Sequence, residues 1–194
     1  MVLVLAGCTG GGPSVGSSGP PESSDRPVVT ESVAPVPSVT PTVSEEERLL
    51  AMIPEEAKGD DLLAAVAMAK FFILLHPGLF KGDDPDLFAF LCLPQSTFCA
   101  TSLASASEGA ARGESQHGGD FTVTGYNERS VLDTWTDETI TALVGFTVSQ
   151  SEYEVVDEAG AVVRDGGPSE FDIAVALRLD EGVWKVYALE FSAL

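Results

Sequence analysis

Two histidines and one carboxylate near the C-terminus are the residues of this 194-residue chain that we consider first for acid–base chemistry. A Ser/His/Asp or Cys/His site needs a histidine as its base, and the chain has only His76 and His117. His76 is expected at a helix end, where the helix dipole favours a positive charge. His117 lies in a Gly-rich stretch over 113–119 that we expect to be a loop. Neither histidine stands in a catalytic motif, so we expect no enzyme.

The carboxylate is Glu190, which has the same strand parity as Trp184 and Val186. A carboxylate on the buried face of a strand could act as a general base. The alternative is that Glu190 lies at a rim or faces outward. Glu190 and Tyr187 are therefore the candidates for polar groups in a pocket, with Lys70 close by. No motif for a metal or a cofactor is present, and we expect neither.

The residues Leu5 to Cys8, Leu-Ala-Gly-Cys, end a short apolar run and resemble the lipobox of bacterial lipoproteins. In that family a signal peptidase cuts before the cysteine, whose thiol receives a diacylglycerol. The resemblance implies that residues 1–7 are the remnant of a signal peptide and that Cys8 is the lipid attachment site. A buried strand is the alternative, but the Gly/Pro run over 9–14 disfavours it. No Lys or Arg precedes Cys8, which predicts a start codon upstream.

Cys92 and Cys99 remain as a pair once Cys8 is lipidated. Disulfides persist in exported proteins, so we expect one here, and closing this short loop stabilises the fold by about 2.5 kcal/mol. Two alternatives remain, namely two free buried thiols or a reactive site. A zinc site would need two more ligands, and Cys-x6-Cys does not have the spacing of a redox Cys-x-x-Cys pair.

Residues 8–43 have the composition of a disordered tether behind the lipid. They contain no aromatic residue and consist mostly of Gly, Pro, Ser and Thr, so they cannot bury enough apolar surface to offset chain entropy. Every aromatic residue lies in 44–194, which we expect to form a single domain.

The net charge of −20 restricts the partners of this chain. Such a field repels phosphate backbones, so no nucleic acid is expected. We expect contact with the membrane through the lipid anchor, and a small apolar ligand or an envelope protein as the partner of the domain.

The first half of the domain has helical patterns. Ser44 to Glu47 is a capping box before a short helix that Pro54 stops. The main helix should follow Asp60 or Asp61, cover 62–75 and end at His76-Pro77-Gly78. Fourteen residues fall short of the about 20 that a membrane span needs.

Two further helices are expected after the main one. Asp84-Pro85 should begin a helix over 86–91 and a last helix should cover 99–111. The trio Asp83, Asp84 and Asp86 lacks the ligand register, the Gly and the closing Glu of a calcium loop, so we expect helix capping there.

From Asp120 onward the pattern is that of strands. Apolar residues alternate with polar ones over 140–148 and 171–179, so each strand should have one buried face. A turn at 180–182 predicts an antiparallel hairpin between the last two long strands. The final strand, 183–191, is apolar at both parities, which predicts a central strand covered on both faces.

Helices followed by a curved antiparallel sheet resemble the nuclear transport factor 2-like (NTF2-like) cone, a cystatin-like fold also seen in polyketide cyclases and ketosteroid isomerases. The predicted class is thus α+β, with three N-terminal helices packed in a curved antiparallel sheet. The segment Ile53-Pro54-Glu55-Glu56-Ala57, with Gly82-Asp83 and the cysteine pair after it, is similar to an actinobacterial lipoprotein family of uncharacterised function.

These features together predict an extracytoplasmic, lipid-anchored protein of the cell membrane with a non-catalytic domain that binds a ligand or a partner. An apolar cavity is expected between the helix of 61–75 and one sheet face. The sheet residues expected around it are Ile140, Val144, Phe146, Ile173 and Val175. The alternatives are a structural or interaction role of the sheet's outer face and, third, an isomerase, cyclase or dehydratase.

Overall fold

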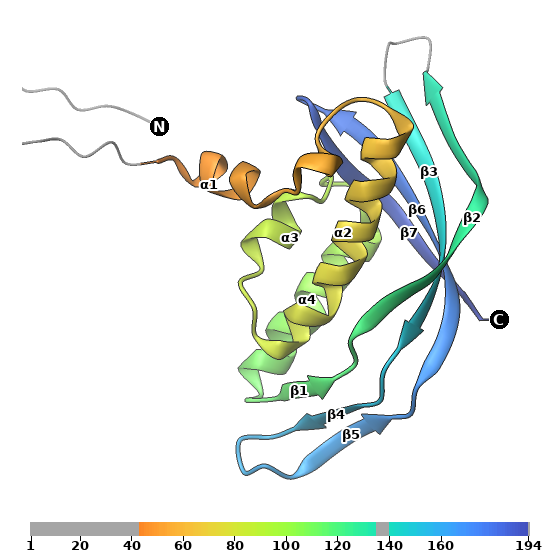
Figure 1. Ribbon diagram of the computed structural model, residues 1–194. Coiled ribbons are helices and arrows are strands. Elements are labelled where there is room, and N and C mark those ends of the chain that lie inside the picture. The colour runs from red at the N-terminus through yellow and green to blue at the C-terminus, as the bar shows by residue number, and fades with distance from the viewer. Residues whose placement is uncertain (1–42, 135–139, 194) are drawn as a thin grey trace, which may run out of the picture. The chain divides into compact units, whose positions relative to one another are not determined.

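Helices form the first part of the domain and strands the second, in a computed structural model that describes residues 43–134 and 140–193 (Figure 1). The helices are α1 (Glu45–Met52), the 3-10 turn η1 (Glu55–Ala57), α2 (Leu62–Lys81), α3 (Asp86–Phe90) and α4 (Thr97–Ala111). The strands are β1 (Ser115–Gly118), β2 (Phe121–Thr134), β3 (Ile140–Gln150), β4 (Tyr153–Val156), β5 (Val162–Gly166), β6 (Ser169–Asp180) and β7 (Val183–Ala193). The α+β class is confirmed, whereas the predicted signal remnant, tether and Cys8 lie outside the described residues.

Helix α1 begins at the predicted capping box. The Ser44 hydroxyl accepts a hydrogen bond from the Glu47 N–H at 3.2 Å, and the Glu47 carboxylate accepts one from the Ser44 N–H at 2.8 Å. Two otherwise unpaired backbone donors of the first turn are satisfied in this way. The helix ends at Met52, just before Pro54.

Helix α2 is capped by Asp61, one of the two predicted capping residues, and continues past the predicted stop. The Asp61 carboxylate accepts a hydrogen bond from the Ala64 N–H at 2.8 Å. Pro77 removes only one backbone donor and its ring is buried, so packing offsets the lost bond. The helix ends at Gly82, whose φ of 88° suits a glycine, and the N–H of Gly82 donates to the carbonyl of Gly78.

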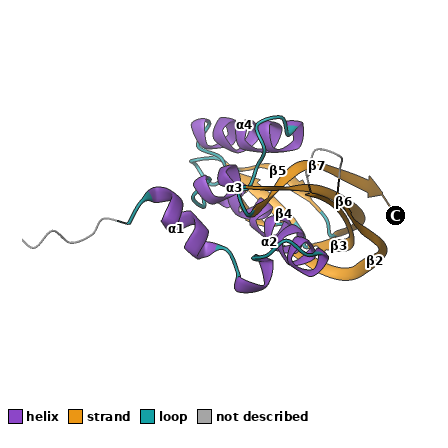
Figure 2. Ribbon diagram, turned by 90° about the horizontal axis from the view of Figure 1, so that it is seen from above, coloured by secondary structure: helices purple, strands orange, loops and turns teal. Residues whose placement is uncertain are grey.

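The length of α2 also corrects the membrane argument. Its 20 residues are long and apolar enough to cross a bilayer by length and composition. In the fold this helix lies along the concave face of the large sheet, and eight of its residues are buried inside the domain (Figures 1 and 2).

Helices α3 and α4 are joined by the predicted disulfide. Cys92 and Cys99 are bonded, with their Cα atoms 6.1 Å apart. The Asp84 carboxylate accepts from the Asp86 N–H at the start of α3, and α4 begins two residues earlier than predicted, where Ser96 caps it. The Asp84 and Asp86 side chains lie beside Arg48, at 3.3 and 3.9 Å.

The strands form a large sheet of order β2-β3-β6-β7 and a small sheet of order β1-β4-β5, both antiparallel. Strands of the two sheets follow one another along the chain with breaks of only two residues. The breaks are 119–120 between β1 and β2, 151–152 between β3 and β4, and 167–168 between β5 and β6. The small sheet is therefore a bent continuation of the large one (Figure 1). Gly118 and Gly119, both with φ of 74°, allow the bend at β1.

Two sequence predictions about the strands are wrong. The Gly-rich stretch over 113–119 contains β1, which pairs with β4, so it is not only a loop. Strand β7 lies at the edge of the large sheet and is not central. Its outer edge is partly covered, because the Leu93 N–H donates to the Val186 carbonyl and the Val186 N–H donates to the Leu91 carbonyl. The β6–β7 hairpin is confirmed.

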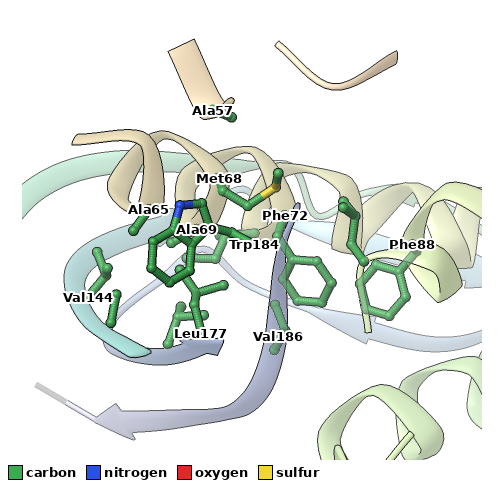
Figure 3. Packing of buried hydrophobic residues seen from close by; sticks show 14 of the residues in the cluster. Ala57, Ala65, Met68, Ala69, Phe72, Phe88, Val144, Leu177, Trp184 and Val186 are labelled. Carbon is green, nitrogen blue, oxygen red and sulfur yellow. The ribbon is translucent and has the colours of Figure 1, made fainter. Parts of the chain in front are cut away.

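Side chains fill the space between α2 and the large sheet (Figure 3). Trp184, Phe72 and Met68 are fully buried there, and the Trp184 indole N–H has no hydrogen-bond partner among the described residues. Four of the five sheet residues expected around a cavity are core residues: Val144, Phe146, Ile173 and Val175. For the fifth residue, Ile140, the structure describes the backbone and not the side chain. The predicted apolar cavity at this place is therefore wrong, because large side chains occupy it.

Candidate functional site

The sequence-predicted pocket residues face solvent. Glu190 and Lys70 are exposed, and the Tyr187 side chain keeps 51% of its surface exposed. A bulge in β7 explains the error: Leu177 pairs with Val186 while Ala176 pairs with Ala188, so Tyr187 is an extra residue. One extra residue inverts the strand parity after it.

Because of the inverted parity, the odd-numbered residues over 188–192 of β7 face the core and the even-numbered ones face outward. Leu189 and Phe191 therefore lie on the side of the core, where Phe191 contacts the rings of Phe98 and Phe171, and Glu190 lies on the outer face. Parity counted from Trp184 alone places Glu190 on the buried face, so the structure agrees with the outward-facing alternative.

A different concave site lies between the helices and the small sheet. Two rows of paired residues form the sheet side of it. Gln116, Val155 and Arg164 are register partners across β1, β4 and β5, and Gly118, Tyr153 and Gly166 form the next row. Residues two apart on a strand share a face, so both rows face the same way.

Tyr153 is held in place by its glycine neighbours. A Cβ atom added at Gly166 would lie 2.4 Å from the Tyr153 ring, and one added at Gly119 would lie 3.2 Å from the Tyr153 Cβ. A side chain at Gly166 would therefore collide with the Tyr153 ring, and one at Gly119 would collide with the Gln116 side chain and crowd the Tyr153 Cβ.

On the helix side of the site, α4 presents small residues, which leave space between the helix and the small sheet. Ser105, Ala106, Gly109 and Ala110 line a groove of about 570 Å³ between α4 and the small sheet. Further lining comes from the last turn of α2, from the connection after α4 and from the small sheet: Leu79, Phe80, Lys81, Gly82, Glu108, Arg112, Gly113, Glu114, Ser115, Gln116, Val155 and Arg164. We call this space the outer groove.

An inner branch of about 230 Å³ adjoins the outer groove. It is lined by residues of α2 and of both sheets: His76, Pro77, Phe80, Gln116, Gly119, Phe121, Gln150, Tyr153 and Arg164. Phe80, Gln116 and Arg164 line both spaces, so the inner branch opens beside the arginine.

His76 lies at the inner branch, among aromatic rings. Its ring is stacked on Phe121 with the centroids 5.8 Å apart, and Phe80, Phe88 and Phe98 lie within 6.0 Å. Burial among these rings lowers the His76 pKa to about 4. The histidine is therefore neutral at neutral pH and lies inside α2, so it is not the charged helix-end residue that the sequence predicted.

Ser102 is the hydrogen-bond partner of His76, with the Ser102 Oγ 3.2 Å from Nε2. This hydroxyl is buried between α2 and α4 and lies outside the lining of the inner branch. No Asp or Glu is among the described residues that line the branch. Among the described residues, the pair therefore lacks both an accessible nucleophile and an orienting acid.

Three positive side chains surround the outer groove, and two of them are neutralised. Lys81 is bonded to Asp120, and Arg112 donates to both oxygens of Glu114 at 2.6 and 3.0 Å, which holds the pKa of Glu114 below its usual value. Arg164 makes no ion pair within 4 Å in the part of the chain that the structure describes. It is the free cation of this site.

The other residues that the sequence analysis considered for reactive or metal chemistry lie outside this site. Cys92 and Cys99 are consumed in the disulfide, and His117 is exposed on β1. Within residues 43–134 and 140–193, no three His, Cys, Asp or Glu side chains gather as metal ligands.

Sequence reasoning missed the site because it ended α2 at His76 and counted β1 as a loop. One signal was available: two apolar residues flank an acid over Tyr153-Glu154-Val155, which is the period of strands.

Comparison with family models finds no match, and comparison with curated proteins finds none either. Among solved structures, the intermembrane space region of the chloroplast protein ARC6 matches 69% of this chain and 98% of its own, with a TM-score of 0.52 and 14% identity. An NTF2-like protein from Cytophaga hutchinsonii matches 66% of this chain and 96% of its own, with a TM-score of 0.42 and 14% identity. A protein with a cystatin-like fold from Caulobacter vibrioides matches 65% and 87%, with a TM-score of 0.35 and 14% identity. The likeness to the ARC6 region shows a shared fold alone.

Proposed function

We propose that this protein is a lipid-anchored, extracytoplasmic member of an actinobacterial lipoprotein family, with an NTF2-like domain that binds a small ligand without turning it over. The observation that carries the proposal is the pair of adjoining spaces, the outer groove between α4 and the small sheet and the inner branch between α2 and both sheets, which end at a largely buried, neutral histidine and open beside an unpaired arginine.

Two features support the exported location. The lipobox-like residues Leu5 to Cys8 provide the anchor, and the bonded pair Cys92 and Cys99 is typical of an oxidising compartment. The composition of 8–43 would let the domain stand away from the bilayer.

Binding without catalysis follows from the chemistry of the groove. A general base works best when its pKa is near the working pH, and the His76 pKa of about 4 is far below neutrality. The Ser102 hydroxyl that His76 touches is buried and does not reach the groove.

Blocking the groove tests the proposal. Ser105 is exposed and lines the outer groove, so Ser105→Trp should fill it without disturbing the core. Ser107→Trp, also exposed on α4 but outside the lining, is the matched control. A library of small molecules, screened by protein NMR, should yield compounds that shift the amides of Gly109, Gly113 and Gly119, which line the two spaces.

Those shifts should disappear in Ser105→Trp and persist in Ser107→Trp. A library without any compound that shifts these amides, or compounds that still bind the blocked variant, would reject the groove as the binding site.

The anchor has its own test. Membrane-extracted protein should show by mass spectrometry a lipid on Cys8, and Cys8→Ser should remain uncleaved or leave the membrane fraction without lipid. An unmodified Cys8 in native protein would contradict the anchor without affecting the groove.

The outer face of the large sheet supports a second candidate, an interaction role. Val131, Leu143, Ala176 and Ala188 are register partners across all four strands, and Val131 and Leu143 remain 53% and 46% exposed. An apolar row of this kind is typical of a protein contact. A photoreactive residue at position 143 should then form a protein adduct in intact cells, whereas one at position 107 should not.

A further inference from the structure

We propose that the ligand of the groove is a small monocarboxylate, in which Arg164 binds the carboxylate and the inner branch holds a ring-sized apolar body. This inference rests on the proposed function, because it names the class of ligand for the same site.

The placement of Arg164 is the first argument. It shares its sheet face with Val155 and lines both the outer groove and the inner branch, so a group bound there bridges the two spaces. A guanidinium offers paired donors that match the two oxygens of a carboxylate. Glu114 acts on Arg164 electrostatically, but both of its oxygens are bonded to Arg112, so Arg164 keeps its donors.

The charges around Arg164 limit the ligand to one negative charge. Glu108 and Glu114 line the same groove, and the other two cations there, Lys81 and Arg112, are paired with acids. A dianion would meet repulsion without a second free cation, and a cationic ligand would be repelled by Arg164. The net charge of −20 weakens long-range attraction of anions, but salt screens it beyond roughly 8 Å at physiological ionic strength.

The inner branch determines the size and the apolar character of the part of the ligand that is not the carboxylate. Its volume of about 230 Å³ suits a single ring or a short branched chain, and its walls include Phe80, Phe121, Pro77 and Tyr153. The neutral His76 adds a polar edge without a charge, so charge selection in this site depends on Arg164.

A matched pair of probes tests the charge of the ligand. In the full chain, 3-phenylpropionate and 3-phenylpropanamide have the same ring and length and differ in the charge of the end group. Titrations followed at the Gly113 and Gly119 amides should give a Kd for the acid that is at least about tenfold lower than for the amide, because the charge-assisted bonds are lost in the amide.

Three variants assign that preference to one residue. Arg164→Gln should make the acid and the amide bind equally, and Arg164→Lys should keep part of the preference, since it keeps the charge and loses the paired donors. Arg178→Gln removes the same charge from β6, outside the lining of either space, and should keep the full preference.

Equal binding of the two probes to the wild-type chain, absence of binding by both, or a preference that survives Arg164→Gln would overturn the inference. The proposed function fails separately. If neutral compounds shift the groove amides and Ser105→Trp blocks them, the groove remains a binding site and only the class of ligand is wrong.

Discussion

The same helical layer meets the large sheet in a solid core and the small sheet in an open groove. Against the large sheet, α2 presents Met68 and Phe72, which fill the space together with Trp184. Against the small sheet, α4 presents residues such as Ala106 and Gly109, and the space stays open. The two regions differ in the size of the side chains that the facing helix presents. Residue size therefore decides which concave face of this domain is core and which is a site.

The electrostatics of the two regions differ in the same way. Every described residue in the core cluster is hydrophobic, whereas Arg164 and Gln116 face the groove. His76 lies at the boundary, on the helix that contributes to both regions. Substitutions in the core should change stability, and substitutions in the groove should change binding.

The largest expected effect is a difference in stability loss between alanine substitutions of two phenylalanines of α2. Phe72→Ala leaves a cavity in the core and should lower the free energy of unfolding by about 3–5 kcal/mol. Phe80→Ala only widens an open groove and should cost less, roughly 1–2 kcal/mol. Urea unfolding measures both. Equal losses would show that the groove wall is part of the core.

The second expected effect is a pH dependence of stability that comes from His76. Its pKa is about 4 in the folded chain and near 6.5 when unfolded, so the unfolded chain binds the proton first as the pH falls. The stabilisation is fully present above pH 6.5 and is lost on the way to pH 4, by roughly 3 kcal/mol.

His76→Gln removes this titration and keeps a polar group near Ser102. The stability difference between wild type and variant should therefore change between pH 7 and pH 4.5, while the carboxylates common to both cancel. A difference that is constant with pH would mean that the inner branch leaves His76 solvated.

The third effect concerns the disulfide, which lies at the core beside the large sheet and not at the groove. Cys92 lies in the segment that pairs with β7, so replacing both Cys92 and Cys99 by Ala should lower the free energy of unfolding by about 2.5 kcal/mol. Binding of small molecules in the groove should be unchanged in NMR titrations. A loss of binding in the folded variant would show that the two regions are coupled.

The smallest effect is at the start of α2. Asp61→Ala removes the hydrogen bond to the Ala64 N–H and should cost about 1 kcal/mol in thermal unfolding. Asp60→Ala, beside it and outside the helix, is the control and should change stability by less than about 0.5 kcal/mol. Equal effects of the two substitutions would refute the assigned cap.

The sequence was sufficient for features that depend on neighbouring residues. The cap at Ser44, the start of α2 at Asp61 and the alternating buried faces of β3 and β6 follow from short-range hydrogen bonding and from strand period. The Cys92–Cys99 bond also followed from the sequence, since it depends on residue count and short spacing.

Long-range packing decided the rest. Only burial by neighbouring elements carried α2 through Pro77, and only the bulge at Tyr187 turned Glu190 away from the core. Likewise, only the pairing of β4 with both β1 and β5 placed Gln116 and Arg164 in one row, on either side of Val155. The groove exists because small residues of α4 meet a bent sheet in which β4 and β5 come from about 40 to 50 residues further along the chain. No local pattern in either segment shows that they meet, because their contact is formed by the tertiary structure.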